Sequence, residues 1–91
     1  MANVNRDEHD FWVRTPSGRL LTVQVKTAAT VRQGKFCFYL GNIGQNTDII
    51  ALVALHPEVV VVCPANQMLQ RWPVSDFTQE RMLASIKEHL A

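Results

Sequence analysis

Cysteine is scarce in this chain, and the two cysteines that occur have no obvious partner. Cys37 and Cys63 lie in the apolar runs FCFYL and VVVVC, and neither belongs to a Cys-x-x-Cys pair. Small secreted domains that depend on disulfides carry a higher density of cysteine. We therefore interpret both residues as buried thiols of a protein in a reducing compartment, the cytoplasm.

Long apolar runs and excess charge are missing as well. The first ten residues, MANVNRDEHD, contain no apolar core of signal-peptide length, and no run approaches the ~20 residues that cross a bilayer. Nine Lys and Arg residues oppose eight Asp and Glu residues, and 47% of the chain is hydrophobic. These values exclude a disordered chain and a uniformly basic protein. They predict one domain over residues 1–91, with residues 1–9 flexible.

Acidic residues are absent from one long segment. Between residues 11 and 47 there is no Asp or Glu, whereas there are five basic residues. The remainder holds four basic and eight acidic residues, so the net charge of +1 conceals a basic segment. A local basic surface is typical of proteins that contact nucleic-acid phosphates. The candidates for such contacts are Arg14, Arg19, Arg32 and Lys35.

The first structural pattern in the chain is that of a β-hairpin. The segment DFWVRT is followed by Pro-Ser-Gly at residues 16–18 and then by RLLTVQVKT, in which apolar and polar residues alternate. Pro16 presets φ for the turn, and Gly18 can adopt the positive φ that closes a three-residue loop. In that loop Thr15 faces Arg19, so the numbers of facing residues add up to 34.

Further strands and a helix are predicted after the hairpin. KFCFYL and EVVVVC are typical of strands, because aromatic and β-branched residues favour them. TDIIALVAL fits either a buried strand or a short helix, and residues 65–73 predict an irregular or single-turn connection. A helix is predicted over residues 76–90, with Asp76 as its N-cap and Gln79 as the partner three residues later. Its packed face would carry Met82, Ile86 and Leu90, with Leu83 beside them.

These elements predict an α/β (α+β) fold. We expect a small mixed β-sheet of about four to five strands that opens with the hairpin, with the C-terminal helix packed on it. A single helix leaves part of such a sheet uncovered. The pattern therefore favours a homodimer or a higher homo-oligomer.

One face of the second hairpin strand carries a chemically informative set of residues. Strand alternation places Gln24 and Lys26 on the same face, and in the predicted register Asp10 lies opposite Gln24, with Cβ atoms roughly 4.5–5.5 Å apart. A carboxylate and an amide oxygen at this separation can hold Mg²⁺ and leave positions for water and phosphate. Lys26 can stabilise charge that develops on a phosphate at the ion.

These residues resemble the signature of the PD-(D/E)XK nuclease superfamily. Asp10 followed by QVKT at residues 24–27 is similar to its glutamine-bearing branch, which includes some group I intron homing endonucleases of mobile elements and related small phage and bacterial proteins. The segments DFWV, VQVKTA, KFCFYL, TDIIALVAL and VVVVCP follow in the order of that branch over residues 10–64. The resemblance implies a restriction-endonuclease-like sheet core, with TDIIALVAL as a strand. It also implies a Mg²⁺- or Mn²⁺-dependent endodeoxyribonuclease, with Asp10 and Gln24 as metal ligands and Lys26 as the catalytic lysine.

The chain departs from this family ahead of Asp10. Members usually carry an N-terminal helix and a first strand there, and the helix often adds an acidic residue. Here nine residues precede Asp10, and Asp7 and Glu8 are the available carboxylates. Glutamine in place of an acid also weakens metal binding. Three alternatives therefore stand beside an active nuclease: a degenerate relative, a module that binds nucleic acid without cutting it, and an oligomeric assembly module in which Gln24 is a structural amide and Lys26 an ordinary exposed lysine.

Overall fold

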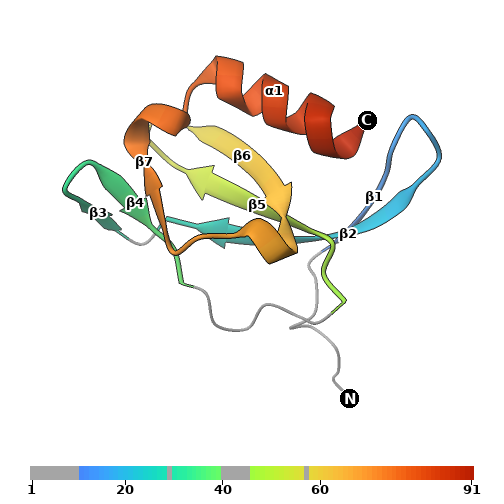
Figure 1. The fold of residues 1–91 in the computed structure, drawn as a ribbon, viewed down its shortest axis with the longest axis horizontal. Helices are drawn as coiled ribbons and strands as arrows, with labels where there is room; N and C mark the ends of the chain where they lie inside the picture. Colours follow the sequence, from blue (N-terminus) through green and yellow to red (C-terminus); the bar gives the residue numbers. More distant parts are fainter. Residues whose placement is uncertain (1–10, 29, 40–45, 57) are drawn as a thin grey trace.

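The chain folds into two packed β-sheets with one C-terminal helix beside them (Figure 1). The computed structural model describes residues 11–28, 30–39, 46–56 and 58–91. The larger sheet has four strands in the order β1-β2-β5-β6, and the smaller sheet has three in the order β3-β4-β7. The α+β fold class and the mixed four-stranded sheet predicted from the sequence are confirmed, whereas the second sheet was not predicted.

The larger sheet combines antiparallel and parallel pairing. β1 (Phe11–Arg14) pairs antiparallel with β2 (Leu20–Thr27), and β2 pairs parallel with β5 (Ile49–Ala54). β6 (Val59–Pro64) pairs antiparallel with β5 and forms one edge of the sheet. TDIIALVAL is therefore a strand rather than a helix, and the Val-rich run before Pro64 is a strand as predicted.

The loop of the first hairpin has the predicted geometry. The Thr15 amide donates to the Arg19 carbonyl oxygen at 2.8 Å, and the Gly18 amide donates to the Thr15 carbonyl oxygen at 2.9 Å. Gly18 has a φ of 95°, a value that glycine adopts without strain. The strand register is consequently the predicted one, with Arg14 opposite Leu20.

The smaller sheet brings together segments that are distant in the sequence. β3 (Thr30–Arg32) and β4 (Lys35–Cys37) form a second hairpin, and β7 (Arg71–Pro73) pairs with the other side of β4. Gln33 and Gly34 form the two-residue turn, with φ values of 53° and 75°. The predicted irregular or single-turn connection over residues 65–73 is thus partly wrong. The short helix η1 (Ala65–Gln67) agrees with a single turn, whereas the strand β7 was not predicted. Strands of three residues are too short to show a clear alternation.

The C-terminal helix α1 (Gln79–Leu90) begins three residues later than predicted. Thr78 is its N-cap, and the Thr78 Oγ1 atom accepts a hydrogen bond from the Arg81 amide at 3.2 Å. Asp76 instead ends the short helix η2 (Val74–Asp76). The delay has a packing cause, because Phe77 between the two helices is buried with its ring 4.8 Å from that of Phe36.

Helix α1 runs along the edge strand β6 (Figure 1). The Val62 amide, which points away from β5, donates to the Ser85 Oγ atom at 3.2 Å. This contact satisfies an amide that an edge strand would otherwise leave exposed. Leu83 is 61% exposed, so its assignment to the packed face is wrong, and Ile86, at 38% exposed, is only partly packed. No helix in the described part of the chain is long and apolar enough to cross a membrane.

The larger sheet buries apolar side chains on both faces. One face packs against the smaller sheet, and its cluster includes Phe36, Phe38, Ile50, Leu52 and Cys63. The other face contains a cluster of Val23, Ile49, Ala51 and Val62, onto which Leu90 of α1 packs. The polar residues of β2 lie at the border of the first cluster, next to Ile50 and Leu52 of β5.

Candidate functional site

The candidate site lies on the face of β2 that is turned toward the smaller sheet. Gln24 pairs with Ile50 and Lys26 with Leu52, and both partners belong to the core between the sheets. Val23, the residue before Gln24, is buried on the opposite face. The structure therefore places Gln24 and Lys26 on one face of one strand, as strand alternation predicted.

Gln24 is held in a defined orientation. The residue is 7% exposed, and its Oε1 atom accepts a hydrogen bond from the Thr47 hydroxyl at 3.3 Å. Thr47, itself buried, precedes β5 and was not among the residues selected from the sequence. A buried amide with a fixed oxygen position can serve as a structural group or as an oxygen donor to a ligand.

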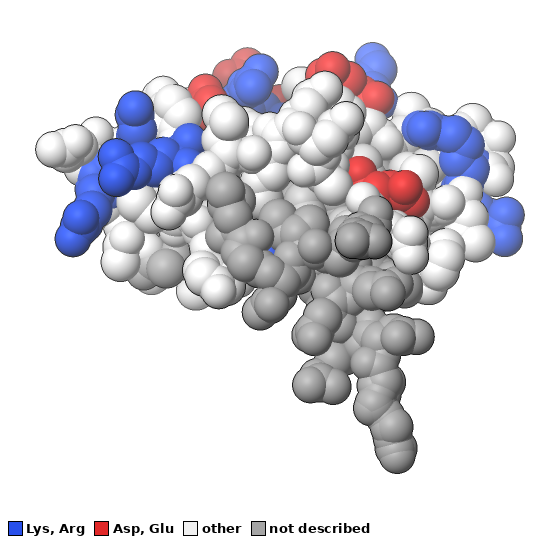
Figure 2. All heavy atoms as spheres, turned by 60° about the horizontal axis from the view of Figure 1, so that its bottom comes forward, with Lys and Arg blue, Asp and Glu red and all other residues white. Residues whose placement is uncertain are grey.

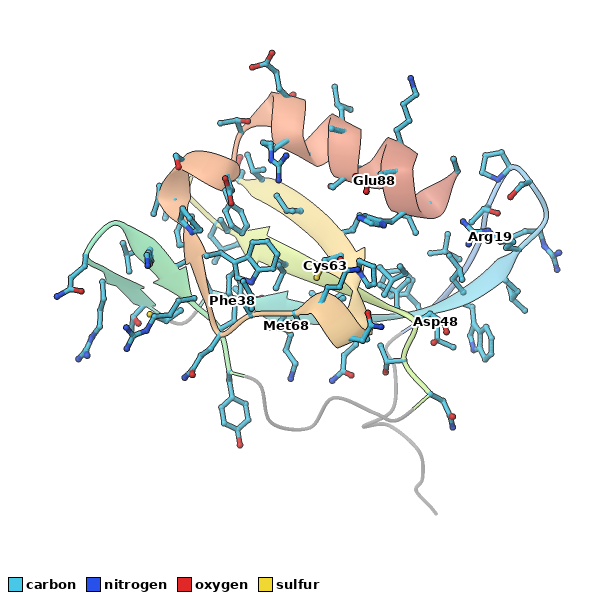
Figure 3. All side chains as sticks on the ribbon, in the orientation of Figure 1. Arg19, Phe38, Asp48, Cys63, Met68 and Glu88 are labelled. Carbon is cyan, nitrogen blue, oxygen red and sulfur yellow. The ribbon has the colours of Figure 1, made fainter. Side chains whose placement is uncertain are left out.

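Asp48 joins the start of β5 to β2 (Figure 3). Its Oδ2 atom accepts hydrogen bonds from the Thr22 amide at 3.0 Å and from the Thr22 hydroxyl at 3.2 Å. In return, the Asp48 amide donates to the Thr22 Oγ1 atom at 2.9 Å. This reciprocal pairing fixes the position of Thr47, one residue earlier, next to Gln24.

Lys26 lies beneath an aromatic ring. Its Nζ atom is 5.7 Å from the centroid of the Tyr39 ring, a separation typical of a cation–π contact. Tyr39 follows β4 and is 67% exposed, so it approaches Lys26 from the smaller sheet while it remains open to solvent. The alternation of buried Phe36 and Phe38 with Cys37 and Tyr39 is a signal that could have identified Tyr39 as an outward residue.

The predicted opposition of Asp10 and Gln24 depends on the register of the hairpin. The structure pairs Phe11 with Val23, Trp12 with Thr22 and Val13 with Leu21, which is the predicted register throughout the described pairs. Asp10 itself lies outside the described residues, and so do Asp7 and Glu8. The assignment of Asp10 as a metal ligand therefore stays a prediction.

Within the described residues, no group of three or more His, Cys, Asp or Glu side chains could hold a metal ion. The oxygen donors that those residues do bring near β2 are the Gln24 amide, the Thr47 hydroxyl and the Asp48 carboxylate. Mg²⁺ commonly takes one or two carboxylates together with water and substrate phosphate. A complete site of this kind would need the Asp10 carboxylate in addition.

The four basic residues selected for nucleic-acid contacts belong to two separate hairpins, and Figure 2 shows Lys and Arg side chains gathered at the left and right ends of the molecule. Arg32 and Lys35 lie on the β3–β4 hairpin, and Arg14 lies on β1 at the other end. The Arg19 Nη2 atom donates to the main-chain oxygen of Ala91 at 3.2 Å and to that of His89 at 3.5 Å (Figure 3). Arg19 thus binds the C-terminal end of α1, where a cation is favourable.

Arg71 is a basic residue that the sequence analysis did not select. Pairing of β7 with β4 places it opposite Cys37, on the small sheet that also carries Arg32 and Lys35. Only the long-range strand pairing brings it there, and no local sequence pattern predicts that pairing.

No family model, curated protein or solved structure matches this chain.

Proposed function

We propose that this chain is a metal-dependent, DNA-acting domain of the PD-(D/E)XK type that hydrolyses phosphodiester bonds. The observation that carries the proposal is the register of the β1–β2 hairpin, together with the shared face of Gln24 and Lys26. If the register continues by one pair beyond Phe11 and Val23, Asp10 would lie opposite Gln24. Two hard oxygen donors and an ammonium group would then share one small area.

Each residue has a distinct role in the proposal. The Asp10 carboxylate and the Gln24 Oε1 atom would hold Mg²⁺ or Mn²⁺, and the Thr47 hydroxyl keeps the Gln24 oxygen in place. When bound, the ion would polarise the phosphodiester and lower the pKa of a water molecule. Lys26 would orient that water or stabilise negative charge on the phosphate. The basic residues Arg14, Arg32 and Lys35 would contact DNA phosphates. Arg19, which the sequence analysis also selected, is instead engaged by the end of α1.

The proposal includes a compartment and an oligomeric state. Cys37 and Cys63 are both free thiols, which suits the reducing cytoplasm. Apolar residues remain exposed on the larger sheet and the helix, namely Phe11, Val25, Leu83 and Ile86. A homodimer or higher homo-oligomer would cover part of this surface, and light scattering would measure the mass in solution.

A second function is supported by the burial of Gln24. An amide that is 7% exposed and hydrogen-bonded to Thr47 stabilises the β2–β5 junction without any metal. The same fold would then act as a non-enzymatic module that binds nucleic acid or protein, or as a catalytically degenerate relative.

A plasmid-nicking assay separates these functions. Purified protein is incubated with supercoiled plasmid and Mg²⁺ or Mn²⁺, next to Asp10→Ala, Lys26→Ala and the control Lys87→Ala, which removes an exposed charge from α1. We expect nicking by the wild type and the control, and a loss of about 100-fold or more in the two site variants. Nicking that survives both site substitutions contradicts the site. Absence of both nicking and DNA retardation at low salt favours the assembly module.

A further inference from the structure

The solvent-facing side of the smaller sheet collects three basic side chains. Arg32 pairs with Lys35, and Arg71 pairs with Cys37, two residues further along β4. Phe36, which lies between Lys35 and Cys37, points inward and is buried. Strand alternation therefore directs Lys35 and Cys37, and the residues paired with them, to the outer side.

These cations have no carboxylate partner among the residues that the structure describes. Among the described residues the structure contains one ion pair, between His89 and Glu88, so Arg32, Lys35 and Arg71 take part in none there. Like charges on facing strands destabilise a sheet. Arg32 and Arg71, with Gln33 between them, also line a shallow hollow on this side. An anionic ligand would offset the repulsion, and the spread over three strands suits a ligand with several phosphates.

An exposed aromatic ring follows the basic residue of β4 along the chain. Tyr39 lies two residues beyond Cys37, a step of about 7 Å along an extended chain. The Phe38 amide donates to the Gln70 carbonyl oxygen at 2.8 Å, so the extended pairing persists up to this point. Tyr39 is 67% exposed and contacts Lys26 on β2. The segment that follows β4 therefore brings an exposed ring next to Lys26 of the candidate site.

We propose that this face, formed by Arg32, Lys35, Arg71 and Tyr39, binds single-stranded nucleic acid. The three cations contact successive phosphates, and an unpaired base stacks on Tyr39. Basic residues next to exposed aromatic rings are the usual means of binding single strands, because every base offers a face for stacking. A duplex hides those faces. This inference rests on the proposed function for the choice of a nucleic-acid partner, and it adds Arg71, Tyr39 and the preference for unpaired strands.

The test is a binding titration without metal. A labelled oligonucleotide of about 16 nucleotides, single-stranded or annealed to its complement, is titrated in EDTA over a series of NaCl concentrations and followed by fluorescence anisotropy. The variants are Arg32→Gln with Arg71→Gln, and Tyr39→Leu. The matched controls are Arg81→Gln with Lys87→Gln, which removes two charges from exposed positions of α1, and Tyr39→Phe, which keeps the ring.

The expected results are specific to this face. The Arg32–Arg71 double variant should lower the slope of log K against log salt by about 1.4, because each phosphate contact with a single strand contributes about 0.7. Tyr39→Leu should weaken single-strand binding roughly 5- to 100-fold and leave duplex binding unchanged. Both controls should behave as the wild type.

Several results would overturn the inference. These are a wild type that prefers the duplex or binds neither form, an equal change of slope in the α1 control, and an unaffected Tyr39→Leu variant. The titration needs neither metal nor cleavage. A protein that does not nick plasmid but binds single strands as expected therefore contradicts only the proposed activity. A protein that nicks plasmid, but whose variants bind single strands as the wild type does, contradicts only this inference.

Discussion

The two hairpins of this protein carry similar charges but hold them in different ways. The β1–β2 hairpin bears Arg14 and Arg19 near its loop, and the β3–β4 hairpin bears Arg32 and Lys35 on either side of its turn. At the first hairpin, the Ser17 hydroxyl and Arg19 both donate to the main-chain oxygen of Ala91, at 3.1 and 3.2 Å. At the second, the basic side chains point to solvent, and Phe36 on the inner side packs into the core.

The number of charges in a sequence segment therefore differs from the number of charges that are available to a ligand. The basic segment contributes Arg19, which already binds the end of α1, as well as residues that form no ion pair within the described parts of the chain. Arg71, far away in the sequence, joins the second hairpin through β7. A surface for an anionic ligand is thus defined by strand pairing rather than by the segment in which the charges occur.

The largest expected difference between the hairpins concerns their inner faces. Phe36→Ala should lower the free energy of unfolding by about 3–5 kcal/mol, because it opens a cavity in the core. Phe36 is 4% exposed and its ring contacts Phe77 edge-on, whereas Phe11 on the first hairpin is 44% exposed. Phe11→Ala should therefore cost less than about 2 kcal/mol. Urea denaturation of both variants measures the two losses. Equal losses would mean that the second hairpin is not the better anchored of the two.

A smaller effect depends on the Cys63 thiol, which lies on β6 in the core between the two sheets. Burial raises the pKa of Cys63 from 9.0 to about 11. Below pH 9 the thiol is neutral in both the folded and the unfolded chain. Between pH 9 and 11 it ionises only in the unfolded chain, so the stability that its neutral form contributes is lost as the pH rises. At 1.36 kcal/mol per pKa unit the loss approaches about 2–3 kcal/mol.

The Cys63→Ala variant isolates this contribution, because other groups also titrate in that range. The free energy of unfolding of the wild type should fall more steeply from pH 9 to 11 than that of Cys63→Ala. Parallel curves would contradict the buried, neutral state of this thiol. Cys37, on the outer side of the smaller sheet and only partly buried, serves as the reference in a second variant, Cys37→Ala.

The larger sheet could be predicted from the sequence because its strands are long or regular. Pro16 and Gly18 specify the loop of the first hairpin, and the run of valines specifies β6. The small sheet could not be predicted for the opposite reason. β3 and β7 are each three residues long, and the turn between β3 and β4 uses Gln33, which lacks the preference of Asn or Asp for positive φ. The helix begins late because Phe77 is needed in the core.

The candidate site was predictable to the extent that it lies on one strand. Alternation alone gives the shared face of Gln24 and Lys26. The contacts from other elements could not be predicted, because Thr47 and Tyr39 reach β2 through pairings that span more than ten residues. The position of Asp10 opposite Gln24 remains a prediction from the hairpin register.

The smallest effect tests the charges of the two hairpins directly, and the two substitutions should have opposite signs. Arg19→Gln removes a cation from the C-terminal end of α1 and should destabilise the protein by about 0.3–1 kcal/mol at low salt. Arg32→Gln removes a charge that faces Lys35, so it should be neutral or should stabilise by up to about 1 kcal/mol. Urea denaturation at low ionic strength measures both. In about 1 M NaCl, where the Debye length is about 3 Å, both differences should shrink toward zero. If Arg32→Gln destabilises the protein as much as Arg19→Gln, the basic face of the second hairpin has structural partners of its own, and the contrast between the hairpins fails.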